Sequence, residues 1–191
     1  MAIMVIGCQF EKTFPASNMS ISDLSAYSVS NDSLVVNRRT GLVYHNNEPF
    51  SGISVSYFNN NLVAEKISYN NGERNGVRQK WFTSGILSYE AVYTANALDG
   101  QVKSWWSNGK LRSVSNFENG VADGLQQEWY SSGSLFKEVN LTAGIENGLQ
   151  RAWRENGKIY INYEAKNGRI FGLKRASLCY ELTNENIVFN D

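Results

Sequence analysis

A 24-residue rhythm of glycine and apolar side chains runs through the centre of the chain. Glycine recurs at Gly52, Gly76, Gly100, Gly124, Gly148 and Gly172, always 24 residues apart. Five residues after each of the first five glycines stands an aromatic residue: Tyr57, Trp81, Trp105, Trp129 and Trp153. Eleven residues after them stands an aliphatic one: Val63, Leu87, Leu111, Leu135 and Ile159. Self-similarity at a fixed period of this length is typical of a repeat array. We therefore predict five repeats over residues 52–171.

Each repeat predicts a β-hairpin. Dipeptides such as Ser84-Gly85 and Asn108-Gly109 separate two apolar runs, a pattern that favours a tight turn between strands. Asn61 and Asn96 replace glycine in this pattern, and asparagine tolerates a left-handed backbone best after glycine, so we expect positive φ at both. The connections are too short for a crossover helix, so neighbouring strands must be antiparallel. The predicted fold class is all-β: an elongated, single-layer antiparallel meander of repeated β-hairpins.

The length of the hairpin loop leaves two alternatives. A two-residue turn would pair the sixth residue after the repeat glycine with the eleventh, whereas a three-residue loop with a glycine bulge pairs the fifth with the eleventh. We favour the second, because it places the recurring tryptophan opposite the recurring aliphatic residue. In the first repeat it predicts one shared face of Ile53, Val55, Tyr57, Val63, Glu65, Ile67 and Tyr69. A slip of one residue would exchange the two faces.

The segments outside the repeats divide into three parts. Residues 1–33 form an apolar start followed by a polar, serine- and asparagine-rich linker. Residues 34–51 are predicted to form an N-terminal capping hairpin, with the turn at Asn37 to Gly41, and residues 172–191 C-terminal capping strands. Atypical terminal units protect the open edges of a repeat array.

The first eight residues suggest a modification site. They are apolar and end in Val5-Ile6-Gly7-Cys8, which resembles a bacterial lipobox, so Cys8 is a lipidation candidate. No basic segment precedes it, and the apolar stretch is shorter than that of a usual signal peptide. We interpret the apolar start of residues 1–33 as a lipoprotein signal remnant and expect a lipoprotein of the cell envelope, with a cytoplasmic protein as the alternative.

Composition excludes several classes of function. The chain has 191 residues with 18 basic and 18 acidic side chains, whereas nucleic-acid binders usually show a basic surface. One histidine and two cysteines argue against most zinc sites and against a disulfide framework. We interpret His45 as a surface or turn histidine and Cys179 as a small buried apolar residue. No catalytic motif is present, so we expect no enzyme, no metal and no small-molecule cofactor.

One repeat unit resembles a known family. The segment Gly124-Leu-Gln-Gln-Glu-Trp-Tyr-Ser-Ser-Gly-Ser-Leu135 is similar to the bacterial variant of the MORN repeat, and the resemblance extends over about residues 41–175. It implies a repeat scaffold without catalytic residues. Bacterial proteins of this kind are often described as antitoxin components of toxin–antitoxin systems or as lipoproteins, and eukaryotic members are linked to membranes or act as scaffolds.

A second column of large side chains is the candidate binding site. Six residues after the repeat glycines stand Phe58, Phe82, Trp106, Tyr130 and Arg154, on the face opposite the tryptophans under the favoured pairing. A single-layer sheet leaves apolar side chains accessible, and such surfaces, rich in Trp, Tyr and Arg, are typical of partner sites.

These five side chains are therefore expected to contact a protein partner. Residues 53–172 carry 13 basic and 11 acidic side chains without the clusters that anionic lipids attract, so a lipid-associated protein anchored through Cys8 is an alternative of lower rank. A carbohydrate-binding module built on aromatic platforms is the third reading.

Overall fold

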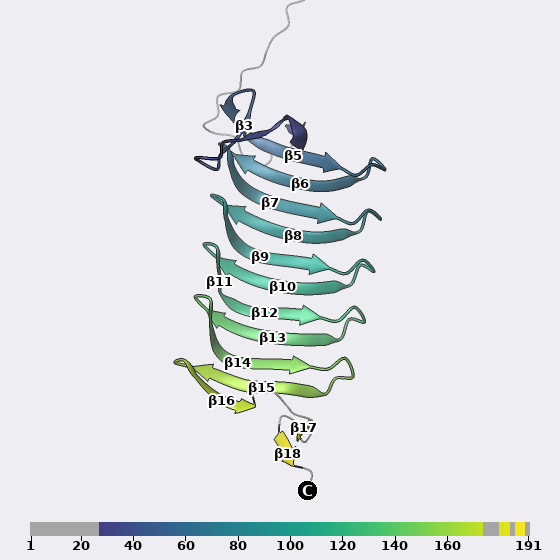
Figure 1. Ribbon diagram of the computed structural model, residues 1–191, viewed down its shortest axis with the longest axis vertical. Helices are drawn as coiled ribbons and strands as arrows, with labels where there is room; N and C mark the ends of the chain where they lie inside the picture. Colours follow the sequence, from purple (N-terminus) through teal and green to yellow (C-terminus); the bar gives the residue numbers. More distant parts are fainter. Residues whose placement is uncertain (1–26, 174–179, 184–185, 190–191) are drawn as a thin grey trace, which may run out of the picture.

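The protein is a long ladder of hairpins in a single sheet (Figure 1). The computed structural model describes residues 27–173, 180–183 and 186–189, so Cys8 and Cys179 lie outside the described residues. Its main sheet has 13 strands, and strands adjacent in the array are adjacent in the sheet. The predicted all-β antiparallel meander is confirmed.

Five hairpins form the body of the sheet. They are β5 (Gly52–Tyr57) with β6 (Val63–Asn70), β7 (Glu73–Trp81) with β8 (Leu87–Thr94), β9 (Ala97–Trp105) with β10 (Leu111–Glu118), β12 (Gly124–Trp129) with β13 (Leu135–Thr142), and β14 (Ile145–Trp153) with β15 (Ile159–Lys166). The short strand β11 (Val121–Ala122) pairs with β10 just before β12, and β16 (Arg169–Leu173) closes the ladder beside β15.

The N-terminal end is covered by additional elements. They are β1 (Ser28–Ser30), the 3-10 helix η1 (Asn31–Ser33), β2 (Val35–Val36), β3 (Val43–His45) and β4 (Glu48–Pro49). The sequence analysis placed residues 28–30 in a linker, but they form β1, which pairs in parallel with β5. This pairing occupies the edge that β5 would otherwise leave open. Strands β2, β3 and β4 form a separate three-stranded sheet, and β17 (Tyr180–Thr183) pairs with β18 (Asn186–Phe189) at the other end.

A small apolar core lies beneath this cap. Val43 and Phe50 of the cap are buried together with Ile67 and Tyr69 of β6. Val29 and Leu34 pack against this cluster. The cap thus shields one end of an array that has no second layer of its own.

The hairpin tips have the three-residue loop that the sequence favours. In the second hairpin the N–H of Phe82 donates to the carbonyl of Ile86 at 2.8 Å, and the N–H of Gly85 donates back to the carbonyl of Phe82 at 2.8 Å. Trp81 lies opposite Leu87. The backbone φ is +62° at Asn61 and +67° at Asn96, so the expectation of a left-handed backbone at both asparagines is confirmed.

The connections between hairpins bend the sheet. Tyr69 pairs with Arg74 and Ile67 with Arg78, so three residues of β7 face only Ser68 on β6. The repeat glycine Gly76 sits in this bulge with a φ of +99°. Bulges bend a strand, and Figure 1 shows the bend at the left-hand ends of β7, β9 and β14. We call this edge of the array the corner edge.

A second bulge makes the predicted face assignment wrong. Trp81 pairs with Leu87 but Lys80 pairs with Tyr89, so Ser88 is an extra residue in β8. Beyond it, the residues that stand thirteen, fifteen and seventeen positions after the repeat glycine lie on the same face as that glycine. The residues two and four positions after the glycine share this face. The tryptophan and the residues one and three positions after the glycine lie on the other face.

The face that carries the repeat glycine lies inside the bend, and we call it the inner face. The hydroxyl of Tyr163 donates to Oε2 of Glu146 at 2.9 Å, joining the two arms of the bend. All buried side chains of hairpins two to five lie on this face: Ala91, Tyr93, Gln150, Ala152, Tyr163 and Ala165. On the opposite, outer face Val77 and Val92 are exposed.

Candidate functional site

The second aromatic column lies at the edge of the sheet formed by the hairpin tips. Phe58, Phe82, Trp106 and Tyr130 are half-buried and Arg154 is exposed. The indole Nε1 of Trp106 donates to the carbonyl of Trp129 at 3.0 Å, and the hydroxyl of Tyr130 donates to the carbonyl of Trp153 at 2.9 Å. These two aromatic side chains therefore link each hairpin to the next as well as presenting part of their surface.

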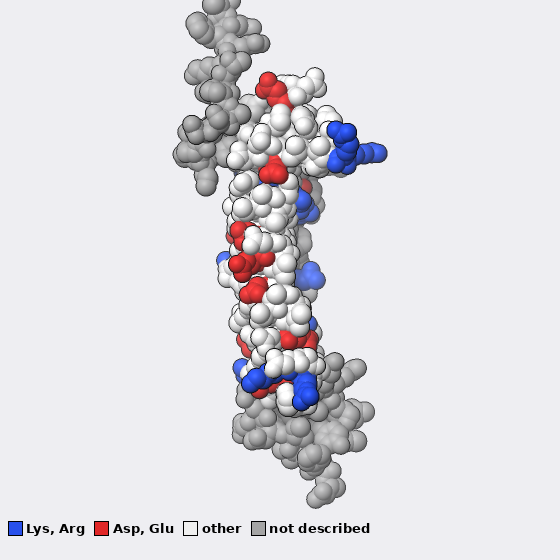
Figure 2. All heavy atoms as spheres, turned by 90° about the vertical axis from the view of Figure 1, so that its left-hand side faces the viewer, with Lys and Arg blue, Asp and Glu red and all other residues white. Residues whose placement is uncertain are grey.

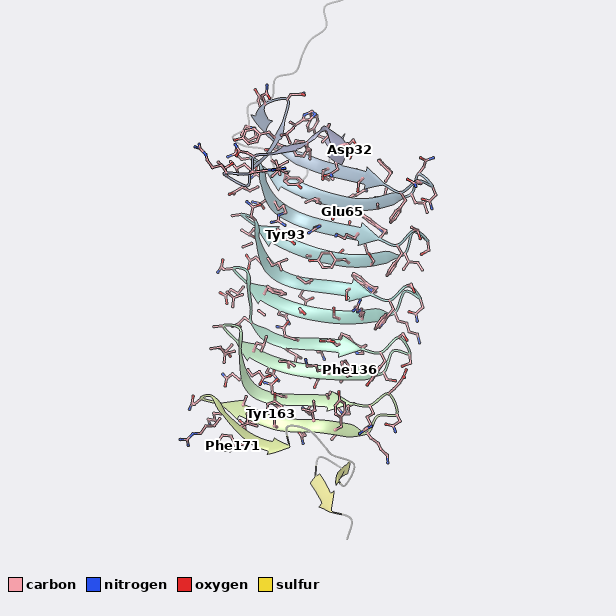
Figure 3. The ribbon with its side chains drawn as sticks, in the orientation of Figure 1. Asp32, Glu65, Tyr93, Phe136, Tyr163 and Phe171 are labelled. Atoms are coloured by element: carbon pink, nitrogen blue, oxygen red, sulfur yellow. The ribbon has the colours of Figure 1, made fainter. Side chains whose placement is uncertain are left out.

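Each of the last three members of this column has a partner side chain, which belongs to the extra residue in the second strand of its hairpin. The guanidinium of Arg112 lies 4.7 Å from the Trp106 ring centroid, and the Tyr130 and Phe136 rings are 5.0 Å apart. The guanidinium of Arg154 lies 5.7 Å from the ring of Tyr160. We call these three pairs the tip column; Figure 3 labels Phe136 near the hairpin tips. The sequence analysis predicted the glycine bulge of the loop but not the extra residue in the second strand, and it therefore missed these partners.

Two tryptophans that stand five residues after a repeat glycine lie on the outer face beside cations. The Lys66 ammonium is 5.9 Å from the Trp81 ring, and the Arg151 guanidinium is 5.8 Å from the Trp153 ring. Both tryptophans are half-buried. They cover the backbone of the single-layered sheet, and the nearby cations add a modest cation–π stabilisation.

A polar cluster occupies the inner face of the first two hairpins. Oε1 of Glu65 accepts from Nε of Arg78 at 2.8 Å and lies 2.7 Å from its Nη2. The Lys80 ammonium is 3.6 Å from the same oxygen. The Arg74 guanidinium lies 4.9 Å from the ring centroid of Tyr93. We call Glu65, Arg74, Arg78, Lys80 and Tyr93 the inner cluster; Figure 3 labels Glu65 and Tyr93.

The inner cluster favours negative charge at Tyr93. Burial alone would raise the pKa of Tyr93, but hydrogen bonds from Arg78 and Tyr89 and the charges of Arg78 and Arg74 lower it below its usual value. The neighbouring Tyr89 responds in the opposite direction: burial and its hydrogen bond to Tyr93 raise the pKa of Tyr89 to about 12. Sequence analysis missed this cluster because two hairpins contribute to it.

The sequence of two hairpins matches a known repeat family. Residues 98–119 and 122–142 match the family model described as MORN repeat variant. Two hairpins of the array are similar to MORN repeats. The matched segments cover β9 with β10 and β12 with β13, and the remaining three hairpins share their period and register. Repeats of this kind form non-catalytic scaffolds. No curated protein matches the chain significantly.

The last hairpin of the array differs electrostatically from the first two. Burial and the hydrogen bond to Glu146 raise the pKa of Tyr163 to about 12. The inner face therefore favours an anion near Tyr93 and disfavours one near Tyr163. Figure 2 looks onto the corner edge, where carboxylates gather along the middle of the array. Glu73, Asp99, Glu118, Asp123 and Glu146 belong to the corner connections or flank them.

The single histidine belongs to the cap. His45 is half-buried in β3, and its Nδ1 lies 3.2 Å from the hydroxyl of Tyr27. Its ring is 5.9 Å from that of Phe50, which in turn contacts Tyr69 at 5.7 Å. The histidine thus packs in an aromatic cluster that closes the N-terminal end of the array.

Two features are absent from the residues that the structure describes. Over those residues no group of three or more His, Cys, Asp or Glu side chains could hold a metal ion. Over the same residues no helix has the length and apolar character needed to cross a membrane.

Proposed function

We propose that this protein is a non-enzymatic scaffold that binds a protein partner through the tip column and its neighbours Phe58 and Phe82. The observation that carries the proposal is the pairing of large side chains along one edge of the array, at Trp106 with Arg112 and Tyr130 with Phe136. Aromatic residues and arginine dominate the energetics of protein interfaces.

The tip column is also held in place before any partner arrives. Trp106 and Tyr130 are anchored by hydrogen bonds to the next hairpin. The side-chain amide of Asn108 donates to the carbonyl of Ser131 at 2.9 Å, and this bond fixes the loops of two neighbouring hairpins relative to each other. Side chains that are already ordered lose little conformational entropy on binding, and this supports a recognition role.

We propose the class of protein partner from the resemblance to MORN repeats. An antitoxin-like or immunity-like role, in which the array binds and blocks another protein, fits a rigid scaffold without catalytic groups. Anchoring at Cys8 would place such a scaffold at the cell envelope.

Affinity capture with the full chain from native lysate, followed by measurement of the dissociation constant for the captured protein, tests this proposal. Arg154→Ala and Phe82→Ala should each weaken binding about fivefold or more, as expected for contacts worth over ~1 kcal/mol. Val77→Ala is the matched control, because Val77 is an exposed apolar side chain on the outer face. Circular dichroism must show that all three variants stay folded. Equal affinities for folded Arg154→Ala, Phe82→Ala and the control would refute the tip column as the binding site.

A further inference from the structure

The inner cluster contains more positive than negative charge at one place on a nearly neutral protein. Arg74, Arg78 and Lys80 face one carboxylate, that of Glu65. Three cations against one anion leave an excess of two positive charges on the inner face of the first two hairpins.

The single carboxylate does not saturate these cations. Arg78 and Lys80 share the same oxygen of Glu65, Oε1, and Arg78 also hydrogen-bonds to the hydroxyl of Tyr93. Lys80 is the more distant partner, at 3.6 Å, and its side chain is 45% exposed. Arg74 stacks on Tyr93 rather than on a carboxylate. Lys80 and Arg74 therefore have donors that an external anion can use.

From this arrangement we propose that the inner cluster binds a carboxylate of an acidic, extended segment of the protein partner. The proposal rests on the proposed function in one respect, that the partner is a protein. Arg74 and Lys80 are the groups that contact the segment, while the carboxylate of Glu65, which pairs with Arg78, competes with the segment for Lys80.

The local electrostatics agree with an anion site. The pKa of Tyr93 is lowered although burial acts to raise it, because the guanidinium groups of Arg78 and Arg74 stabilise a nearby negative charge. Glu146 at the other end of the inner face has the opposite effect on Tyr163. An acidic segment is therefore attracted to the first two hairpins and not to the last.

The neighbouring hairpin can accommodate the rest of such a segment. Next to the inner cluster the inner face of β9 and β10 carries the short side chains Ser104, Ser113 and Ser115. The hydroxyls of Ser104 and Ser113 are 2.6 Å apart. These residues project little from the sheet and offer hydroxyl groups to a passing backbone.

The distribution of charge favours a protein segment over a membrane surface. Anionic membranes attract clusters of several exposed basic residues. Here the cations lie inside the bend of the sheet, whereas the corner edge beside them carries carboxylates (Figure 2). A flat anionic surface would meet those carboxylates, while a narrow segment can reach the inner face.

Titration calorimetry of the full chain with a capped hexaglutamate peptide tests the site, with capped hexaglutamine as the uncharged probe. We expect hexaglutamate to bind and hexaglutamine not to bind. Lys80→Gln and Arg74→Gln should each weaken hexaglutamate binding about three- to tenfold, and raising the salt from ~50 mM to ~500 mM should weaken it further. Glu65→Gln should strengthen binding by a similar factor, because it removes the competing carboxylate; a purely structural role of Glu65 predicts no gain.

Lys103→Gln on the outer face is the matched control and should leave binding within about twofold. Equal weakening by the control would show non-specific charge attraction and overturn the site. Preferential binding of inorganic phosphate, or of phosphatidylcholine vesicles with about one quarter phosphatidylserine, would overturn the assignment to a carboxylate segment. If the wild-type chain captures a partner but does not bind hexaglutamate, only the anion site is refuted. If the wild-type chain binds hexaglutamate but Arg154→Ala and Phe82→Ala leave partner capture unchanged, only the tip column is refuted.

Discussion

The side-chain amide of Gln150 fills a gap in the backbone ladder between the fourth and fifth hairpins. The bulge at the corner edge leaves the backbone of Asn140 without its ordinary ladder partners. Oε1 of Gln150 accepts from the N–H of Asn140 at 3.0 Å, and Nε2 donates to the carbonyl of Asn140 at 2.8 Å. Gln150 is only 2% exposed. The side chain thus replaces a strand backbone at this point.

Gln150→Met would remove these bonds while keeping the length of the side chain. The N–H and the carbonyl of Asn140 would both lose a partner, at about 1–3 kcal/mol for each buried group. Asn140 is half-buried, so water can satisfy part of the loss. We expect a loss of about 2–4 kcal/mol in the free energy of unfolding, which for a chain of this size lowers the melting temperature by about 5–15 °C.

Thermal melts by circular dichroism and hydrogen exchange at Asn140 measure this effect. Gln127→Met is the matched control: Nε2 of Gln127 donates to Oε1 of Glu138 at 2.9 Å between half-buried side chains on the outer face, so its loss should cost under ~1 kcal/mol. Exchange at Asn140 should accelerate in Gln150→Met alone. If the two variants melt within about 2 °C of each other, the amide is not a substitute for the ladder.

Three further predictions concern turns, a close contact and pH. Ala143 has a φ of +49° in a two-residue turn, so Ala143→Asn should stabilise the protein by about 0.5–1 kcal/mol in urea unfolding, whereas Ala97→Asn within β9 should not stabilise it. Gly72→Ala should destabilise by about 2 kcal/mol more than Gly157→Ala, because both have similar positive φ but only at Gly72 would the new Cβ lie 2.9 Å from the carbonyl of Val43; equal losses in melts would contradict this. The folded-state pKa of Tyr163 is raised to about 12, so its contribution to stability is complete below pH ~10 and is lost as the pH rises to about 12. The stability difference between wild type and Tyr163→Phe should therefore shrink over that range, and a constant difference would refute the raised pKa.

The sequence by itself determined the local features of this protein. The 24-residue period, the tip loops, the pairing of Trp81 with Leu87 and the positive φ at Asn61 and Asn96 all follow from residues close together in the chain. Such features are visible because turn geometry and strand alternation are short-range properties.

Only the tertiary structure decided which face each side chain occupies. The extra residue in the second strand of each hairpin is alanine, serine, arginine, phenylalanine or tyrosine in the five repeats, so no residue type marks it. One unmarked residue exchanges the faces. The inner cluster, the Gln150 amide in the ladder and the pairing of β1 with β5 each join residues from different hairpins or from the cap. Contacts of that kind depend on how neighbouring strands are aligned, and a periodic sequence pattern does not contain that alignment.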